Sequence, residues 1–532
     1  MKNLSKTLAC LLVLFIGMGT ASARVLTTSS SPNQTDTVNT VLPSTGLPFQ
    51  VVIQKANFQL PVGFHSGVVG VYKGMWIFIG GRTNGLHGFG PTNNFPADQQ
   101  NMNIYIVNPT TGAVSSRALT DRSSGLTQQQ IDSLTVTSPQ AYQESYTLFM
   151  TGGYGVDTAT GTFGTKPVLT VFNLPGIVDW VSGKSGASVA NNIQQFYNSE
   201  FQITGGRMFK VGNITQLVFG QNFDGQYTNS SNGNYSEQVR QFRINGVGGS
   251  ISVDIYNSIP SMPNASYRRR DLNVLPALLN NSGTLQYGLV AYGGVFTTDS
   301  GVWTVPVVIN GSSNPVMADP NSPASFKQAM NQYVTAAASL YSRKSMSMYH
   351  VLFGGISYGF FSNGVFSTDT EIPFINQVTT IQMDKNGNFT QYLMNNEYPV
   401  IPSTGTNPGN TLLFGAGAYF IPTNISQYPN TVINLDNIRK TTVIGHIIGG
   451  IQSTLPNTNV NADSAASPYI FTVTLVPTNL ATAPQSAKLT ALVPVAPPSQ
   501  QALLRVAHLE QKYNHKYSGS SSLPTRQSHH SV

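Results

Sequence analysis

The sequence predicts an all-β protein built as a six-bladed β-propeller, and three observations support this prediction. An apolar strand that ends in a glycine pair recurs along the chain at intervals of 61 to 95 residues. Each copy stands among further apolar segments bounded by turn residues, so one unit holds about four strands. Charged residues make up only 9% of a chain with 50 Gly and 31 Pro, which favours short strands and turns over long charged helices.

The glycine-terminated strand appears six times. A hairpin partner precedes each copy, and a further strand or hairpin follows, such as NIYIVNPTTGAVSSRAL (103–119) in the first unit and PVLTVFNLPGIVDWV (167–181) in the second. We expect this strand to be the inner strand of its blade, where glycine permits positive φ and close approach of neighbouring blades. The glycine positions are Gly80-Gly81, Gly152-Gly153, Gly293-Gly294, Gly354-Gly355 and Gly449-Gly450, with Gly220-Gln221 as a degenerate copy.

The last unit is one strand short, because no fourth strand follows PYIFTVTLV (468–476). The strand FQVVIQKANFQL (49–60) stands alone before the first hairpin. We therefore expect this N-terminal strand to complete the last blade and close the ring. Closure would remove sheet edges that otherwise invite aggregation.

A four-stranded unit with a strand-terminal Gly-Gly resembles the kelch repeat, and the resemblance covers about residues 49–477. The segments GGRTNGLHGF, FGQNFDGQY and RRRDLNVLP are also similar to exported bacterial propeller proteins. The units exceed the ~50-residue kelch period because long connections follow the glycine pairs. Galactose oxidase shares the kelch architecture but needs a cysteine cross-linked to a copper-binding tyrosine, and the mature chain expected here has no cysteine.

Residues 1–23 have the pattern of a signal peptide, with Lys2 and Lys6 before an apolar stretch and a small-residue cleavage site at 21–23. The apolar stretch is shorter than the ~20 residues that span a bilayer, so we expect no transmembrane segment after cleavage. Cys10, the sole cysteine, lies within this segment, which excludes disulfides and cysteine chemistry from the mature chain. The protein is predicted to be exported to the periplasm, the extracellular space or the cell surface.

The predicted domains are the signal peptide, a disordered leader (24–48), the propeller (49–477) and a flexible basic tail (478–532) in which residues 501–513 can form a short helix. That helix is either transient or a docking segment. The net charge is +7, but the signal and the tail carry nearly all of it. A nucleic-acid-binding face needs a basic patch on the folded body, and we expect no nucleic-acid partner.

The connections after the glycine pairs should emerge on one face and form a rim around one mouth of the central channel, where binding residues are usually found. Arg82, Asn84 and His87 follow the first pair; they can bind an anion or transfer protons, or simply brace the loop. Asp224 can contact a sugar hydroxyl, although an Asp-Gly step is chiefly a turn signal. No EF-hand pattern is present, and no metal is expected.

The densest charge cluster is Arg268-Arg269-Arg270-Asp271, which opens the fourth unit. One arginine is expected to pair with Asp271, leaving Arg269 or Arg270 to hold an anionic ligand. His350 and His446 lie in apolar strands and are interpreted as core histidines.

The leading hypothesis is a non-catalytic binding propeller, active as a monomer without a cofactor, whose ligand is a glycan, a cell-envelope component or a protein. The alternative is a sugar isomerase or mutarotase acting on an acidic sugar, since some exported kelch propellers work on such sugars. That alternative needs an arginine and either a carboxylate or His87 to converge at one channel mouth. A third interpretation, a purely structural protein, requires a channel filled by apolar side chains.

Overall fold

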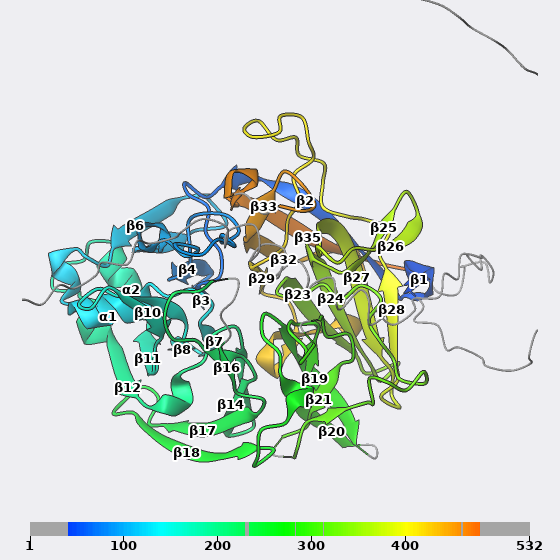
Figure 1. Cartoon of the computed structure of the whole chain (residues 1–532), viewed down its shortest axis with the longest axis horizontal. Coiled ribbons are helices and arrows are strands. Elements are labelled where there is room, and N and C mark those ends of the chain that lie inside the picture. Colours follow the sequence, from blue (N-terminus) through cyan, green and yellow to red (C-terminus); the bar gives the residue numbers. More distant parts are fainter. Residues whose placement is uncertain are drawn as a thin grey trace, which may run out of the picture. The chain divides into compact units, whose positions relative to one another are not determined.

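The computed structural model describes residues 41–228, 233–281, 284–299, 301–311, 313–458 and 461–478. Over these ranges the chain is mostly β-strand, with two α-helices, Gln128–Leu134 (α1) and Leu174–Val181 (α2). The sheets are arranged around a central axis as in a β-propeller (Figure 1). No helix in the described part of the chain could cross a membrane. The predicted signal peptide (1–23), most of the predicted leader and residues 479–532 lie outside the described residues.

Five sheets have the four antiparallel strands of a propeller blade. The first two sheets along the chain are β3 (Val68–Tyr72), β4 (Met75–Ile79), β5 (Asn103–Val107) and β6 (Val114–Ala118), and then β7 (Gln140–Glu144), β8 (Thr147–Thr151), β11 (Val168–Asn173) and β12 (Ile193–Tyr197). The next two are β13 (Arg207–Val211), β14 (Ile214–Val218), β17 (Val239–Asn245) and β18 (Ser252–Ile259), and then β19 (Asn273–Asn281), β20 (Thr284–Tyr292), β21 (Val307–Ile309) and β22 (Val316–Met317). The last sheet consists of β29 (Ala418–Pro422), β32 (Thr442–Gly449), β35 (Tyr469–Pro477) and the N-terminal strand β2 (Phe49–Gln59).

The expected fifth unit is instead part of a seven-stranded sheet, so five four-stranded sheets are present where six were predicted. The predicted leader contributes the outermost strand β1 (Val41–Pro43), which pairs parallel with β28 (Phe389–Leu393). On the other side of the sheet, β31 (Val432–Asn434) pairs parallel with β23 (Ala336–Ser342). Residues 41–43 of the predicted disordered leader are therefore ordered. The strand order is β1 (Val41–Pro43), β28 (Phe389–Leu393), β27 (Phe374–Met383), β24 (Ser347–Ile356), β23 (Ala336–Ser342), β31 (Val432–Asn434) and β30 (Gln427–Tyr428).

The N-terminal strand β2 pairs antiparallel with β35, the last strand of the described chain, from Phe49 opposite Pro477 to Gln59 opposite Tyr469. Apolar clusters fill the spaces between consecutive sheets. One of them joins the first sheet to the last, through Trp76, Phe78 and Ile448. The chain thus makes its core in separate layers between sheets, as expected for a propeller.

The glycine-terminated strand is the second strand of its repeated unit, which corrects the prediction that it lies innermost. The strands that border the central channel are the first of each unit: β3, β7, β13, β19, β23 and β29. The prediction failed because the glycines approach a neighbouring sheet rather than the channel axis.

The glycine pairs contact the segment that leads into the next unit. All ten glycines of the five pairs have φ between 58° and 93°. A Cβ on Gly152 would lie 1.9 Å from the carbonyl oxygen of Ile203, and the Gly153 amide donates a 2.8 Å hydrogen bond to that same oxygen. The last unit makes the equivalent contact with the first, where the Gly450 amide donates to the Phe64 carbonyl at 3.0 Å.

In the third unit the two positive-φ positions are Phe219 (55°) and Gly220 (84°), not Gly220 and Gln221 as the sequence alignment of the repeats implied. The Gly220 amide donates to the Arg269 carbonyl at 3.0 Å, as the second glycine does elsewhere. Positive φ costs a bulky residue roughly 1–3 kcal/mol. Phe219 is fully buried and stacks on Tyr267 at 5.5 Å between ring centroids, which offsets this cost.

The segment 167–181, predicted as a strand or hairpin, contains the strand β11 and then the helix α2. Pro175 lies in the first turn of that helix, where its missing N–H costs nothing. The helix buries Ile177 and Trp180 in the core between the first two sheets.

Substitutions at Gly152 and Gly161 can distinguish the effect on stability of the backbone contact between units from the conformational cost of positive φ. Gly152 (φ 65°) is crowded by Ile203, whereas Gly161 (φ 70°) has no atom within 4 Å of a built Cβ. We predict that Gly152→Ala lowers the free energy of unfolding by about 3 kcal/mol, because it adds a backbone clash to the conformational cost. Gly161→Ala should cost only about 1 kcal/mol. Urea denaturation of both variants checks this, and equal losses would contradict the interlock.

Candidate functional site

A cavity of about 330 Å³ lies among the residues that follow the glycine pairs; we name it the upper cavity. Each unit contributes the residue just after its glycine position and the residue that faces it across a local backbone bridge. In the first unit, for example, His65 and Arg82 exchange backbone hydrogen bonds of 3.0 and 2.9 Å. The six pairs are His65 and Arg82, Thr137 and Tyr154, Thr204 and Gln221, Arg270 and Val295, Tyr333 and Ile356, and Ala416 and Ile451.

In each unit, the residue that follows the first member of the pair, such as Ser66 after His65, lies at the base of this cavity. Together these six residues form a ring, which we name the throat. All six throat residues have φ between 48° and 69°, and neighbours are joined by backbone hydrogen bonds, such as Ser138 N–H to the Ser66 carbonyl at 2.7 Å and Gly417 N–H to the Val334 carbonyl at 2.6 Å. The throat also borders a second cavity of about 360 Å³, the lower cavity. Its members are Ser66, Ser138, Gly205, Asp271, Val334 and Gly417.

The wall of the upper cavity is largely apolar, and most of its polar groups come from the first four units. These units supply histidine, arginine, threonine, tyrosine and glutamine side chains together with several phenylalanines, whereas the last two supply mainly Ile356, Ile372, Phe374 and Ile451. A pocket with an apolar wall and a few convergent polar groups is typical of small-ligand sites. The cavity is therefore not filled by apolar side chains, as the purely structural interpretation required.

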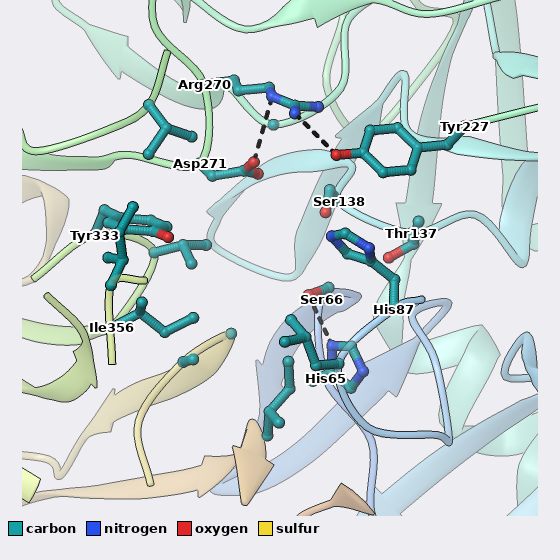
Figure 2. Close-up of a pocket in the computed structure, with 18 of the residues that line it drawn as sticks. His65, Ser66, His87, Thr137, Ser138, Tyr227, Arg270, Asp271, Tyr333 and Ile356 are labelled. Atoms are coloured by element: carbon teal, nitrogen blue, oxygen red, sulfur yellow. Dashed lines mark hydrogen bonds and ion pairs between the residues drawn. The ribbon is translucent and has the colours of Figure 1, made fainter. Parts of the chain in front are cut away.

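Arg270 is the cation that faces this cavity. Its Nη2 donates to the Tyr227 hydroxyl at 3.4 Å, and its Nε lies 3.7 Å from Oδ2 of Asp271 (Figure 2). The guanidinium lies over the ring of Phe296, 4.8 Å from its centroid. Burial raises the pKa of Asp271, while the charges of Arg270 and Arg207 oppose that shift. The expected pairing of one arginine with Asp271 is thus made by Arg270.

His87 points into the upper cavity (Figure 2) and is neutral at pH 7. Burial lowers its pKa to about 4, and the charges of Arg270 and Arg82 act in the same direction. Its Nδ1 lies 2.8 Å from the Gly88 carbonyl oxygen, which can only accept, so Nδ1 carries the proton. The Nε2 lone pair is consequently left as a hydrogen-bond acceptor.

Aromatic rings from two connections surround this histidine. The His87 ring lies 4.8 Å from Phe95 and 5.0 Å from Tyr227, measured between centroids. Asn94 Nδ2 donates to the Tyr227 carbonyl at 2.8 Å, which ties the first connection to the third. Two long loops are thereby fixed against each other over the cavity.

Arg82 borders the same cavity, but its guanidinium is hydrogen-bonded to residues of its own loop. Nε donates to Asn84 Oδ1 at 2.9 Å, Nη2 donates to the Pro96 carbonyl at 2.8 Å, and the side chain is 2% exposed. Burial lowers the pKa of Arg82 to about 10. Asn84 is not among the cavity-lining residues, and its contacts fit the interpretation of a braced loop.

Two further predicted residues, Arg269 and Asp224, lie outside the upper cavity. Arg269 is fully buried between sheets, with Nη1 3.3 Å from the Val305 carbonyl and the guanidinium 4.4 Å from the Trp303 ring centroid. Successive side chains of an extended chain point to opposite sides, so Arg269 and Arg270 cannot share the cavity. Asp224 is exposed, in a bridge with Gly164.

Sequence reasoning missed several cavity residues, notably His65, Tyr227 and Tyr333. His65 and Tyr333 precede the throat positions of their units, and aligning the first strands of the units could have found them. Tyr227 lies in an irregular connection and carries no such signal. Glu371 also borders the cavity.

His350 has the environment of a core histidine. It is completely buried, its Nδ1 is 2.8 Å from the Tyr292 hydroxyl and its Nε2 is 3.2 Å from the Pro276 carbonyl. Burial lowers its pKa to about 4. Across the described ranges, no group of three or more His, Cys, Asp or Glu residues is placed to hold a metal ion.

Comparisons with known proteins identify no family for this chain. No family model matches it, and no curated protein matches it. Among solved structures, one titled "Structure of YjhT" matches with a TM-score of 0.41 and 10% identity, covering 79% of this chain and 98% of the other. Similarity at this level transfers no function from that protein.

The buried histidines predict acid sensitivity. Burial lowers the pKa of His65 to about 3 and that of His350 to about 4, whereas unfolded histidine titrates near 6.5. The unfolded state therefore binds more protons as pH falls below about 6.5, and stability is lost by up to ~1.4 kcal/mol per pH unit for each histidine. Urea denaturation between pH 7.5 and 5.0 should show this decline, with a shallower slope for His350→Phe. A wild-type stability that stays constant over this range would refute the assignment.

Proposed function

We propose that this protein is an exported binding propeller whose upper cavity holds a small anionic ligand, a glycan or a cell-envelope fragment. The observation that supports this is the convergence of Arg270, His87 and a set of aromatic rings on one cavity built from all six repeated units. The volume of about 330 Å³ lies at the lower end of the range for small-molecule sites.

Each part of the wall suits a different part of such a ligand. Arg270 would form a charge-assisted hydrogen bond with a carboxylate or sulfate group, since its side chain lines the cavity. The His87 Nε2 lone pair would accept a hydrogen bond from a hydroxyl. The rings of Phe95 and Tyr227 offer apolar faces to the ligand body.

The proposal includes a closed ring of six kelch-like blades. The four central strands of the seven-stranded sheet, β23, β24, β27 and β28, would form the remaining blade, with β1 and β31 as additions at its edges. The β2–β35 pairing and the hydrogen bond from Gly450 to Phe64 support closure between the last unit and the first. Export rests on the signal-like residues 1–23, and a mature N-terminus at Arg24 in secreted protein would support it.

A second candidate function is a mutarotase or isomerase acting on an acidic sugar. The observation that favours it is that His87 and Asp271, both able to exchange protons, border the same cavity as Arg270. Opening and closing a sugar ring needs one group that donates a proton and one that accepts it. His87, with its Nε2 lone pair, and Asp271, whose carboxyl pKa is raised by burial, supply the two groups.

Glycan-array binding by the full chain tests the first proposal. We predict that Arg270→Gln weakens binding to carboxylated glycans at least tenfold, because a bidentate cation is lost. Asp224→Asn removes a charge on an exposed loop outside the cavity and should leave binding unchanged. If both variants bind carboxylated glycans equally well, Arg270 does not take part in binding. If the protein binds another protein and no glycan, the ligand is a protein.

The enzymatic alternative makes a separate prediction. Exchange between the anomers of a uronic acid, followed by NMR magnetisation transfer, should speed up in the presence of wild-type protein and slow at least tenfold in His87→Gln. If the sugar binds but the exchange rate does not change, the enzymatic alternative is wrong and only the binding function stands.

A further inference from the structure

The lower cavity, on the other side of the throat, contains a second cation. It has a volume of about 360 Å³ and is bordered by the innermost strand of every unit. Its charged lining residues are Arg207, at the start of β13, and Asp271 of the throat. Asp271 is paired with Arg270 above the throat, so Arg207 is the charge that characterises this cavity.

The guanidinium of Arg207 has no partner among the described residues: no hydrogen bond, ion pair or ring contact involves it. The three arginines of the fourth unit differ, since Arg268, Arg269 and Arg270 each contact a carbonyl or hydroxyl oxygen and an aromatic ring. Burial lowers the pKa of Arg207, with Tyr419 and Asp271 opposing the shift. A half-buried arginine without a partner is costly unless a ligand anion supplies one.

One hydroxyl group that borders the same cavity has a proton left to donate. The Tyr419 hydroxyl accepts a hydrogen bond from the Gly67 amide, so its own proton is free for another acceptor. The remaining wall is largely apolar, with Val69, Val71, Ala141, Phe209, Leu275 and Ile421.

We propose that the lower cavity is a second binding site, for a small monocarboxylate with an apolar body. Arg207 would bind the carboxylate in its two-pronged geometry, with the Tyr419 hydroxyl as an additional donor. The segment of residues 429–431 covers the cavity from the side opposite the throat, where Asn430 Nδ2 donates to the Lys210 carbonyl at 2.9 Å. This site is separate from the proposed glycan site, and either can exist without the other.

The probe for the test is 4-bromobenzoate, titrated into the full chain by calorimetry. We expect wild-type protein and Arg122→Gln, a change of an exposed arginine outside both cavities, to bind it with equal affinity. Arg207→Gln should bind it at least tenfold more weakly, and the neutral 4-bromobenzamide should bind at least tenfold more weakly than the acid. Anomalous scattering from bromine in soaked crystals should place the probe below the throat.

Tyr419→Phe, a smaller change, keeps the test decisive if Arg207→Gln does not fold. Loss of one donor should weaken the probe several-fold. The proposal is overturned if wild-type protein does not bind the probe, if the folded Arg207 or Tyr419 variant binds as tightly as wild type, or if the bromine lies above the throat.

Discussion

The contact on which the rest of this structure depends is a backbone hydrogen bond between neighbouring units. In five of the six units, the second residue of the glycine position donates its amide to the chain that enters the next unit, as Gly153 does to Ile203 at 2.8 Å. Because both partners are backbone atoms, no side chain can replace the contact. The positive φ that directs the amide outward also leaves no room for a Cβ. Phe219 shows that a larger residue is accepted only with compensating burial and stacking.

This interlock fixes the positions of the functional residues. The residue after each glycine position is held at the cavity wall by a bridge to the residue before the throat. The throat residues then hold one another through their backbones, which leaves their side chains free to differ among units. One scaffold can therefore present Arg270 and His65 on one side and Ile356 on the other. Rigid elements that carry variable side chains are what a selective site requires.

The sequence predicted the repeated strands and the face on which the site lies, because apolar runs and glycine pairs are strong signals. It also named Arg82, His87, Arg270 and Asp271 as candidate ligand-binding residues, and all four line the upper cavity. It could not decide between Arg269 and Arg270, since a one-residue difference in register reverses which side chain enters the cavity. Strands of three residues, such as β1 and β31, have too little periodicity to be recognised. The seven-stranded sheet was missed for that reason.

Native-state hydrogen exchange tests the interlock most directly. The amides to follow are those of Gly81, Gly153, Gly220, Gly355 and Gly450, each bonded to the chain that enters another unit. A closed and mutually supported ring predicts that all five exchange with the free energy of global unfolding. If Gly450 exchanged at a clearly lower free energy than the other four, the last and first units would separate on their own, and the account of a single closed scaffold would be contradicted.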